Sequence, residues 1–141
     1  MTKLAFLENW YDRVWTRGDL SGIDEFFAPC AGADGLMPDG QVSAEDFRAL
    51  VPALRALVRD LKIEIDRHQE GDDWLWAQIN VHALPAQGAT PIQASGQVML
   101  RFEGDQIVEA YNMFDFLTFF EKAGFLPKDA FMLLLSGETL G

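Results

Sequence analysis

From Leu61 onward, apolar residues alternate with polar ones, and this pattern constrains the fold more than any other feature of the chain. Strict alternation is typical of a strand with one buried face. The dipeptides Gly71-Asp72 and Gly104-Asp105 favour hairpin turns, because glycine and aspartate tolerate positive φ. We therefore expect strands over residues 61–66, 74–84, 93–102 and 107–114, mostly antiparallel and joined by hairpins.

The first sixty residues have helical periodicity instead. An amphipathic helix that ends near Gly18 is predicted by an apolar stripe at helical spacing, which consists of Leu4, Leu7, Tyr11, Val14 and Trp15. A second short helix is predicted over 20–27 and a third over 43–58. Pro52 should kink or split the third helix, because proline lacks the N–H that a helix interior needs. Helices followed by hairpin-linked strands predict an α+β domain, with helices packed on one face of a sheet.

The third helix also has a start signal. Ser43 and Asp46 have the spacing of a capping pair, although a glutamate or glutamine is more usual at the second position. Between residues 30 and 40, glycines, aspartates and a proline indicate an irregular segment around at most one short strand.

The composition favours one acidic globular domain over residues 1–141. The chain is 49% hydrophobic, and its formal net charge of -11 should repel nucleic acid and anionic lipid surfaces. Charges at Glu8, Asp12 and Arg13 argue against an N-terminal signal peptide or membrane span. The single Cys30 cannot form an internal disulfide and fits a reducing compartment, so we expect a cytoplasmic protein.

Asp115 lies where the last strand gives way to a helix rich in aromatic residues, which Gly124 should end. If those aromatic side chains enclose the carboxylate, its ionised form loses hydration and the group can exchange protons near neutral pH. The alternative is that Asp115 is the N-cap of that helix, where its oxygens accept backbone N–H bonds.

Alternation divides each strand into two faces but does not say which face is buried. In the strand over 74–84, one face carries Trp74, Trp76, Gln78, Asn80 and His82, and the other carries Leu75, Ala77, Ile79, Val81 and Ala83. If the second face is the buried one, the tryptophan and histidine face is exposed or forms a dimer interface. In the strand over 107–114, a period of two groups Ile107, Glu109, Tyr111, Met113 and Asp115.

The element order and the ending GDQIVEAYNMFDFLTFFEKAG resemble the nuclear transport factor 2-like cone fold and, within it, the SnoaL-like polyketide and ester cyclases. In the last third this family shows a Gly-x-Ile-Val-Glu strand, an aromatic residue two positions after the glutamate, an aspartate, and a helix with a Leu-Gly-like turn. The matching residues are Gly104, Ile107, Val108, Glu109, Tyr111, Asp115 and Gly124. The resemblance implies one SnoaL-like domain over 1–141, in which N-terminal helices and a curved, mostly antiparallel sheet enclose an apolar pocket.

The resemblance also implies an enzyme without metal or cofactor, in which Asp115 is the acid/base of an aldol-type ring closure on an apolar or polyketide-like substrate. It favours His82 and Asn80 pointing into the pocket, where His82 would share a proton or polarise a carbonyl. The apolar walls would then be Tyr111, Met113, Trp74, Trp76 and Trp10. The chain departs from the family pattern with Tyr111 in place of tryptophan, Ala123 in place of leucine, and His82-Ala83 in place of His-Gly.

Two alternatives remain open at this point. The same fold could bind an apolar small molecule without catalysis, or serve as a dimeric structural domain. We expect a homodimer, because helices cover one face of the sheet and leave the other face needing cover. Two histidines and one cysteine provide no zinc-type ligand spacing, so no metal site is expected.

Overall fold

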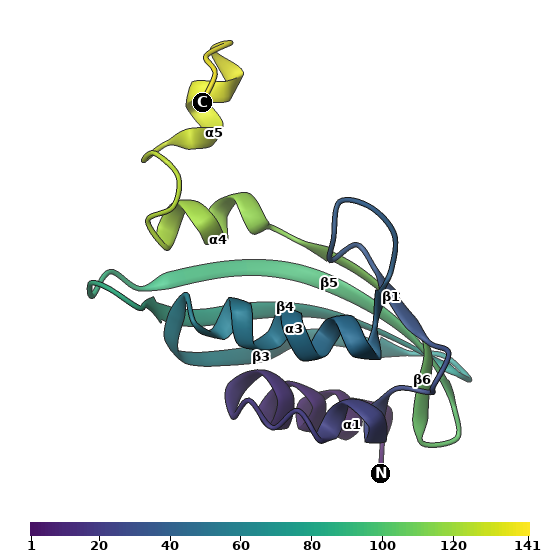
Figure 1. The fold of residues 1–141 in the computed structure, drawn as a ribbon. Helices are drawn as coiled ribbons and strands as arrows, with labels where there is room; N and C mark the ends of the chain where they lie inside the picture. The colour runs from purple at the N-terminus through teal and green to yellow at the C-terminus, as the bar shows by residue number, and fades with distance from the viewer.

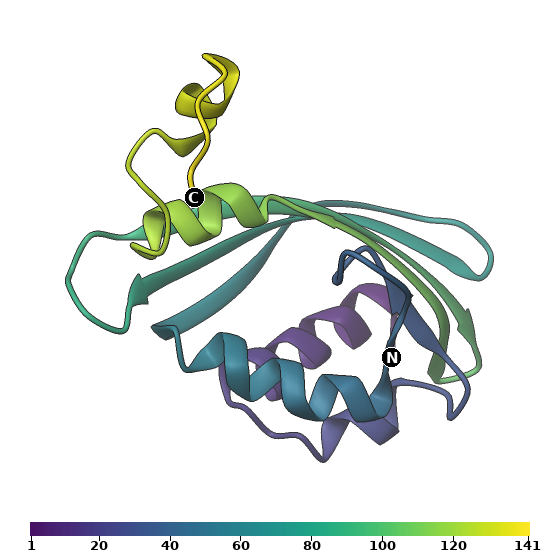
Figure 2. The same ribbon diagram turned by 45° about the horizontal axis from the view of Figure 1, so that its top comes forward.

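The computed structural model describes residues 1–141 and arranges them in two layers, with the N-terminal helices on the concave side of one curved sheet (Figures 1 and 2). The π-helix η1 continues the first helix without a break. In chain order the elements are α1 (Lys3–Trp10), η1 (Tyr11–Thr16), α2 (Gly22–Phe26), β1 (Gly32–Asp34), β2 (Val42–Ser43), α3 (Ala44–Arg55), β3 (Val58–Glu70), β4 (Trp74–Pro85), β5 (Ile92–Glu103), β6 (Gln106–Phe114), α4 (Phe116–Lys122) and α5 (Ala130–Leu135).

The six strands form one sheet in the order β2-β1-β6-β5-β4-β3. Strands β3 to β6 pair with their sequence neighbours in antiparallel fashion, and β1 pairs with β6 in parallel. The predicted Gly104-Asp105 turn joins β5 to β6, and Gly104 has a φ of 59°, which glycine adopts without strain. The predicted α+β class, with N-terminal helices packed on a curved and mostly antiparallel sheet, is confirmed.

A bulge in β6 changes which of its side chains face the helices. Val108 is an extra residue on β6, at the point where the register with β5 shifts. One extra residue moves every following side chain to the opposite face. Ile107 is fully buried, whereas Tyr111 and Met113 beyond the bulge are 41% and 77% exposed. The prediction that Ile107 shares a face with the later alternate residues is therefore wrong; those residues are Glu109, Tyr111, Met113 and Asp115.

Helix α3 begins at the predicted capping pair. The Ser43 hydroxyl accepts a hydrogen bond from the Asp46 N–H at 3.1 Å, and the Asp46 carboxylate accepts one from the Ser43 N–H at 3.0 Å. The helix is not split at Pro52, but it ends at Arg55, because the chain enters β3 at Val58. Pro52 is exposed in the last turn of the helix, so water can reach the carbonyl that it leaves without a donor.

Apolar side chains fill the space between the helices and the sheet. Leu7, Val14 and Ile23 from the helical layer are fully buried, and each large apolar side chain buried in this way contributes about 1.5–3 kcal/mol. On β4 the buried residues are Leu75, Ala77, Ile79, Val81, Ala83 and Pro85. This face of β4 therefore contacts the helices, and the tryptophan and histidine face lies on the outside of the sheet.

The C-terminal residues form two short helices, of which only the first packs on the sheet. Helix α4 packs on the sheet through Phe119 and is followed by Gly124, whose φ of 92° fits the predicted helix stop. Helix α5, which the sequence did not predict, projects away from the sheet and the N-terminal helices in both ribbon views (Figures 1 and 2). No helix of the chain is both long enough and apolar enough to cross a bilayer.

Candidate ligand-binding pocket

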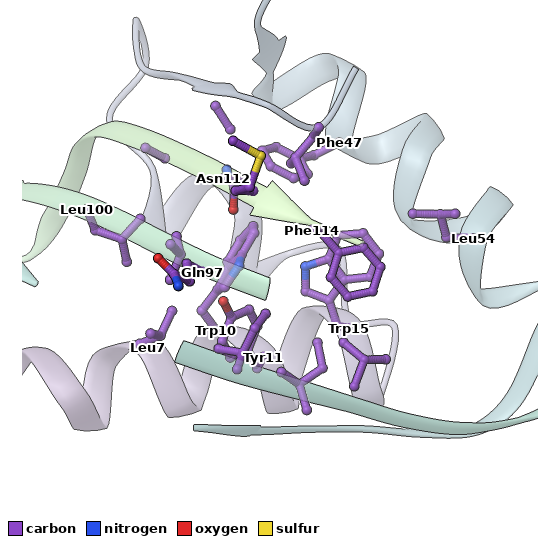
Figure 3. A pocket seen from close by; sticks show the side chains of 18 of the residues that line it. Leu7, Trp10, Tyr11, Trp15, Phe47, Leu54, Gln97, Leu100, Asn112 and Phe114 are labelled. Atoms are coloured by element: carbon purple, nitrogen blue, oxygen red, sulfur yellow. The ribbon is translucent and has the colours of Figure 1, made fainter. Parts of the chain in front are cut away.

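A cavity of about 110 Å³ lies between the helical layer and the concave face of the sheet (Figure 3). Of its 24 lining residues, 22 are hydrophobic, and none is an aspartate, glutamate, histidine, lysine or arginine. The walls include Leu7, Trp10, Tyr11 and Trp15 from α1 and η1, Phe47 and Leu54 from α3, Ile79 and Val81 from β4, Val98 and Leu100 from β5, Ala110, Asn112, Met113 and Phe114 from β6, and Phe116 and Phe119 from α4. The cavity is therefore built for an apolar occupant.

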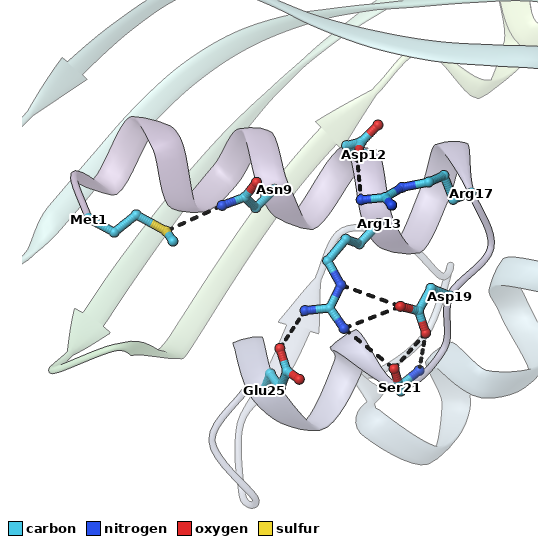
Figure 4. A network of polar contacts seen from close by, with 8 residues as sticks. All are labelled: Met1, Asn9, Asp12, Arg13, Arg17, Asp19, Ser21 and Glu25. Atoms are coloured by element: carbon cyan, nitrogen blue, oxygen red, sulfur yellow. Dashed lines mark hydrogen bonds and ion pairs between the residues drawn. The ribbon is translucent and has the colours of Figure 1, made fainter.

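Polar contacts on the outer side of the helices hold η1 in place. Arg13 pairs with Glu25 of α2 and with Asp19 at 3.2 Å, and these bonds raise the pKa of Arg13 (Figure 4). At the other end, Arg55 of α3 donates to the carbonyls of Trp15 and Thr16 at 2.9 and 3.1 Å. The Arg55 bonds satisfy carbonyls that a helix end leaves free, so the aromatic side chains of η1 sit on a fixed backbone.

Tyr11 brings a polar group to this apolar cavity. Its side chain is 7% exposed, and its hydroxyl makes no hydrogen bond within the protein. Burial raises the pKa of Tyr11 well above its usual value, because the phenolate would be poorly solvated there. The hydroxyl is therefore neutral at physiological pH and able to donate. Tyr11 belongs to the π-helix, a rare geometry that is frequent at functional sites.

Asn112 brings a second polar group, from the sheet side of the cavity. Its amide nitrogen donates to the Asp34 carbonyl at 3.1 Å, which ties β6 to β1 and orients the amide. The Asn112 side-chain oxygen accepts no hydrogen bond from the protein. The sequence analysis missed Asn112 because the Val108 bulge turns it inward, and it missed Tyr11 because that residue was counted as part of an apolar helix stripe.

Asp115 has the geometry of a helix cap. One carboxylate oxygen accepts from the Thr118 N–H at 3.0 Å and the other from the Thr118 hydroxyl at 2.6 Å. The side chain is exposed and does not line the cavity, although its neighbours Phe114 and Phe116 do. The sequence left two interpretations of Asp115 open, and in the structure this residue is the N-cap of α4.

The structure does not bring His82 and Asn80 together with the cavity. Both lie on the outer face of the sheet, where His82 Nε2 is 3.1 Å from Glu64 of β3. Trp74 and Trp76 share that outer face: Trp74 stacks on Tyr111 at 6.4 Å, and the Trp76 indole donates to Gln97 at 3.3 Å. The expectation that these four β4 residues face inward with Asp115 is corrected, because the smaller aliphatic face of β4 is the buried one.

Among the other predicted wall residues, Trp10 lines the cavity and is 5% exposed, as expected. Met113 borders the cavity while remaining 77% exposed, so it lies at the rim. Tyr111 lies outside, where its hydroxyl donates to Glu109 at 2.6 Å and lowers the pKa of that carboxyl together with Arg101. Nowhere do three or more histidine, cysteine, aspartate or glutamate side chains gather in a metal-binding arrangement.

The cavity between a curved sheet and N-terminal helices places the chain in one class of small α+β proteins. In this class the sheet and the helices form a cone around a ligand pocket. The chain belongs to the SnoaL-like domain family, whose model matches residues 7–110. The matched range contains Trp10, Tyr11 and most of the sheet, and it ends before Asp115. No curated protein has significant sequence similarity to the chain.

Solved structures share the fold at low sequence identity. A candidate polyketide cyclase from Acidithiobacillus ferrooxidans is 20% identical with a TM-score of 0.68, over 84% of this chain and 92% of that one. AclR, a candidate hydroxylase from Streptomyces galilaeus, is 22% identical with a TM-score of 0.73, over 95% and 88%. A Catenulispora acidiphila protein with a ketosteroid isomerase-like fold is 16% identical with a TM-score of 0.75, over 91% and 98%. At these identities the likeness establishes the nuclear transport factor 2-like fold alone.

Proposed function

We propose that this protein binds a small, mainly apolar molecule in the cavity between its helices and its sheet. The observation that carries the proposal is the lining, in which 22 of 24 residues are hydrophobic and none is charged. Transfer of apolar ligand surface from water into such a site is favourable by roughly 25 cal/mol per Å². An apolar cavity of about 150 Å³ takes up benzene, and the volume here of about 110 Å³ is smaller, so even a benzene-sized ring presses on the walls. A larger ligand needs the rim at Met113 to open.

The test is the binding of ethylbenzene. Binding is measured through the change in fluorescence of Trp10 and Trp15, which line the cavity. Ala110→Leu places a larger side chain on the cavity wall and should weaken binding at least tenfold. Ala94→Leu is the matched control, because Ala94 is equally buried on the sheet but does not line the cavity. Both variants are overpacked and should lose stability by about 1–3 kcal/mol. Equal weakening by both, or no binding to the wild type, would contradict the proposal.

A second candidate function is a cyclase or isomerase reaction with Asp115 as acid/base. Support comes from the position of Asp115 between Phe114 and Phe116, which both line the cavity, and from the polyketide cyclase named among the structural relatives. Rotation away from Thr118 would turn the carboxylate toward the rim. It would then take a proton from the carbon next to a substrate carbonyl, the resulting enolate carbon would form a bond to a second carbonyl carbon, and the alkoxide would take the proton back.

This chemistry can be tested without the natural substrate, because 2-indanone exchanges the protons next to its carbonyl for deuterium in D₂O. Catalysed exchange followed by NMR should fall about a hundredfold or more in Asp115→Asn, since asparagine keeps the shape and cannot take a proton. Ethylbenzene binding should be unchanged in the variant. Exchange at the same rate in both proteins, or no catalysed exchange by the wild type, would leave ligand binding as the function.

A further inference from the structure

We infer that the ligand of this cavity is a neutral molecule that carries a hydroxyl group, held between Tyr11 on the helical side and Asn112 on the sheet side (Figure 3). The inference deepens the proposed binding function and rests on it. It names the polar part of a ligand whose apolar part the hydrophobic lining residues already define. The one other polar lining residue, Gln97, is exposed, and its amide oxygen accepts from the Trp76 indole.

Tyr11 carries the first part of the argument. More than nine-tenths of its surface is buried, and nearly all buried polar groups in proteins have a hydrogen-bond partner. Its hydroxyl has none, yet every fully enclosed polar side-chain atom of this protein is paired. The hydroxyl therefore touches free space, and Tyr11 lines the cavity. A partner for it can therefore come from the occupant of the cavity, and from water when no ligand is bound.

Asn112 carries the second part. Its nitrogen is committed to the Asp34 carbonyl at 3.1 Å, which fixes the amide so that its oxygen is the free end. An amide oxygen only accepts hydrogen bonds. In Figure 3 the labelled Asn112 and Tyr11 come from opposite walls of the cavity, β6 and η1. A ligand between them meets one acceptor and one group that donates or accepts.

The two groups together select a class of ligand. A hydroxyl can accept from Tyr11 and donate to Asn112, so an alcohol, a phenol or an enol satisfies both. A ketone accepts from Tyr11 and leaves the Asn112 oxygen unpaired, and a hydrocarbon leaves both unpaired. A charged ligand is disfavoured because no charged side chain lines the cavity to compensate for its lost hydration.

The experiment measures the affinities of 4-ethylphenol, acetophenone and ethylbenzene, which are similar in size and differ in hydrogen bonding. Wild type should prefer 4-ethylphenol to ethylbenzene by about three- to tenfold for each hydrogen bond gained, with acetophenone between them. Tyr11→Phe removes only the hydroxyl and should reduce this preference by the three- to tenfold that one hydrogen bond contributes, leaving the share of Asn112. Tyr111→Phe is the matched control, because the Tyr111 hydroxyl bonds Glu109 on the outer face of the sheet.

The outcomes separate the inference from the function on which it rests. A reduced phenol preference in Tyr11→Phe, with the preference intact in Tyr111→Phe, supports the inference. If the wild type binds all three compounds equally, or Tyr11→Phe keeps the full preference, the inference is wrong and the apolar pocket stands. If none of the three compounds binds the wild type, both are wrong. The comparison within the wild type does not depend on how well either variant folds.

Discussion

At the scale of single residues, Asp115 shows how one side chain can fit two chemical roles. Its carboxylate oxygens accept hydrogen bonds from Thr118 and so cap the start of α4. Because Asp115 also lies next to residues that line the cavity, we propose an acid/base role for it as well. The two roles make different demands on the side chain. Capping needs only an acceptor, which asparagine also provides, whereas proton transfer needs the carboxylate.

We therefore expect Asp115→Ala to lower the free energy of unfolding by about 1 kcal/mol, and Asp115→Asn to lower it by much less. Urea denaturation of the three proteins measures this difference. Ethylbenzene affinity should be the same in all three, because Asp115 does not line the cavity. An equal loss of stability in both variants would mean that the carboxylate charge matters more than the cap.

Gly35 supports the polar end of the cavity from behind. Its φ is 88°, and a Cβ atom built there would lie 1.8 Å from the backbone oxygen of Asn112. Gly40 also has a positive φ, of 73°, but a Cβ atom there has open space around it. An alanine at either position has backbone strain, but only an alanine at Gly35 also has a steric clash. Comparing the two substitutions therefore separates the cost of strain from the cost of the clash.

Gly40→Ala should cost roughly 1–2 kcal/mol, the price of a left-handed alanine. Gly35→Ala should cost more, because the segment after β1 must also move away from β6, and it should weaken the preference of the cavity for 4-ethylphenol. Thermal unfolding and ligand titration check the two effects. Similar losses of stability in both variants would show that the backbone of β6 at Asn112 moves at little cost to make room for the Cβ atom.

At the scale of elements, the capping box of α3 makes the stability of the helix depend on pH. The Ser43 backbone N–H bonds the Asp46 carboxylate and lowers the pKa of Asp46 below its ordinary value of 3.8. A group whose pKa is lower in the folded state stabilises the fold above its unfolded pKa, and this contribution is lost as the pH falls through the folded value.

We expect Asp46→Asn to be less stable than the wild type at pH 7, because it lacks the negative charge at the helix N-terminus. The difference should shrink as the pH falls below about 4, where the wild-type carboxyl also loses its charge. Unfolding curves at pH 7, 5 and 3 measure this change. A difference that stays constant over this range would exclude the carboxylate charge as its source.

Elements with local signals were predictable from the sequence, and the choice of inner face was not. The hairpin turn at Gly104, the cap at Ser43 and the helix stop at Gly124 each depend on a few adjacent residues. Which face of β4 and β6 is buried depends on how the strands pair. On β4 both the aliphatic and the aromatic face could be buried, and on β6 one bulge reverses the alternation. The same limitation applied to the site: Trp10 was predicted as a wall residue from the family resemblance, whereas the inward direction of Asn112 depends on the bulge, which the sequence does not reveal.

At the scale of the whole molecule, apolar side chains lie on the outer face of the sheet, where no helix covers them. Met99 and Tyr111 are 46% and 41% exposed, and the register of β4, β5 and β6 places Trp76, Met99 and Tyr111 in one row. Exposed patches of this kind are typical of protein interfaces. The predicted homodimer is therefore proposed to form through this face, as a symmetric contact between two copies.

Light scattering should give twice the chain mass of 15.8 kDa at micromolar concentration, and more dimer at higher salt, because salt screens the repulsion between chains of charge -11. Met99→Glu should shift the protein toward the monomer. Met37→Glu is the matched control, because Met37 is 49% exposed but lies in the segment between β1 and β2. A monomer in the wild type, or an equal shift in both variants, would contradict this interface.

The contact between Asn112 and Asp34 has a consequence for the order in which the chain folds. It joins residues 78 positions apart, and the parallel pairing of β1 with β6 joins residues 77 positions apart, such as Ala33 and Ala110. Strands β3 to β6 instead form by short hairpins. Local contacts form early and distant ones late, because closing a long loop costs more chain entropy. The strands should therefore assemble before the polar end of the cavity exists. Amide protons at β1 should then exchange faster than those of β4 and β5, and a ligand that bonds Asn112 should slow them most.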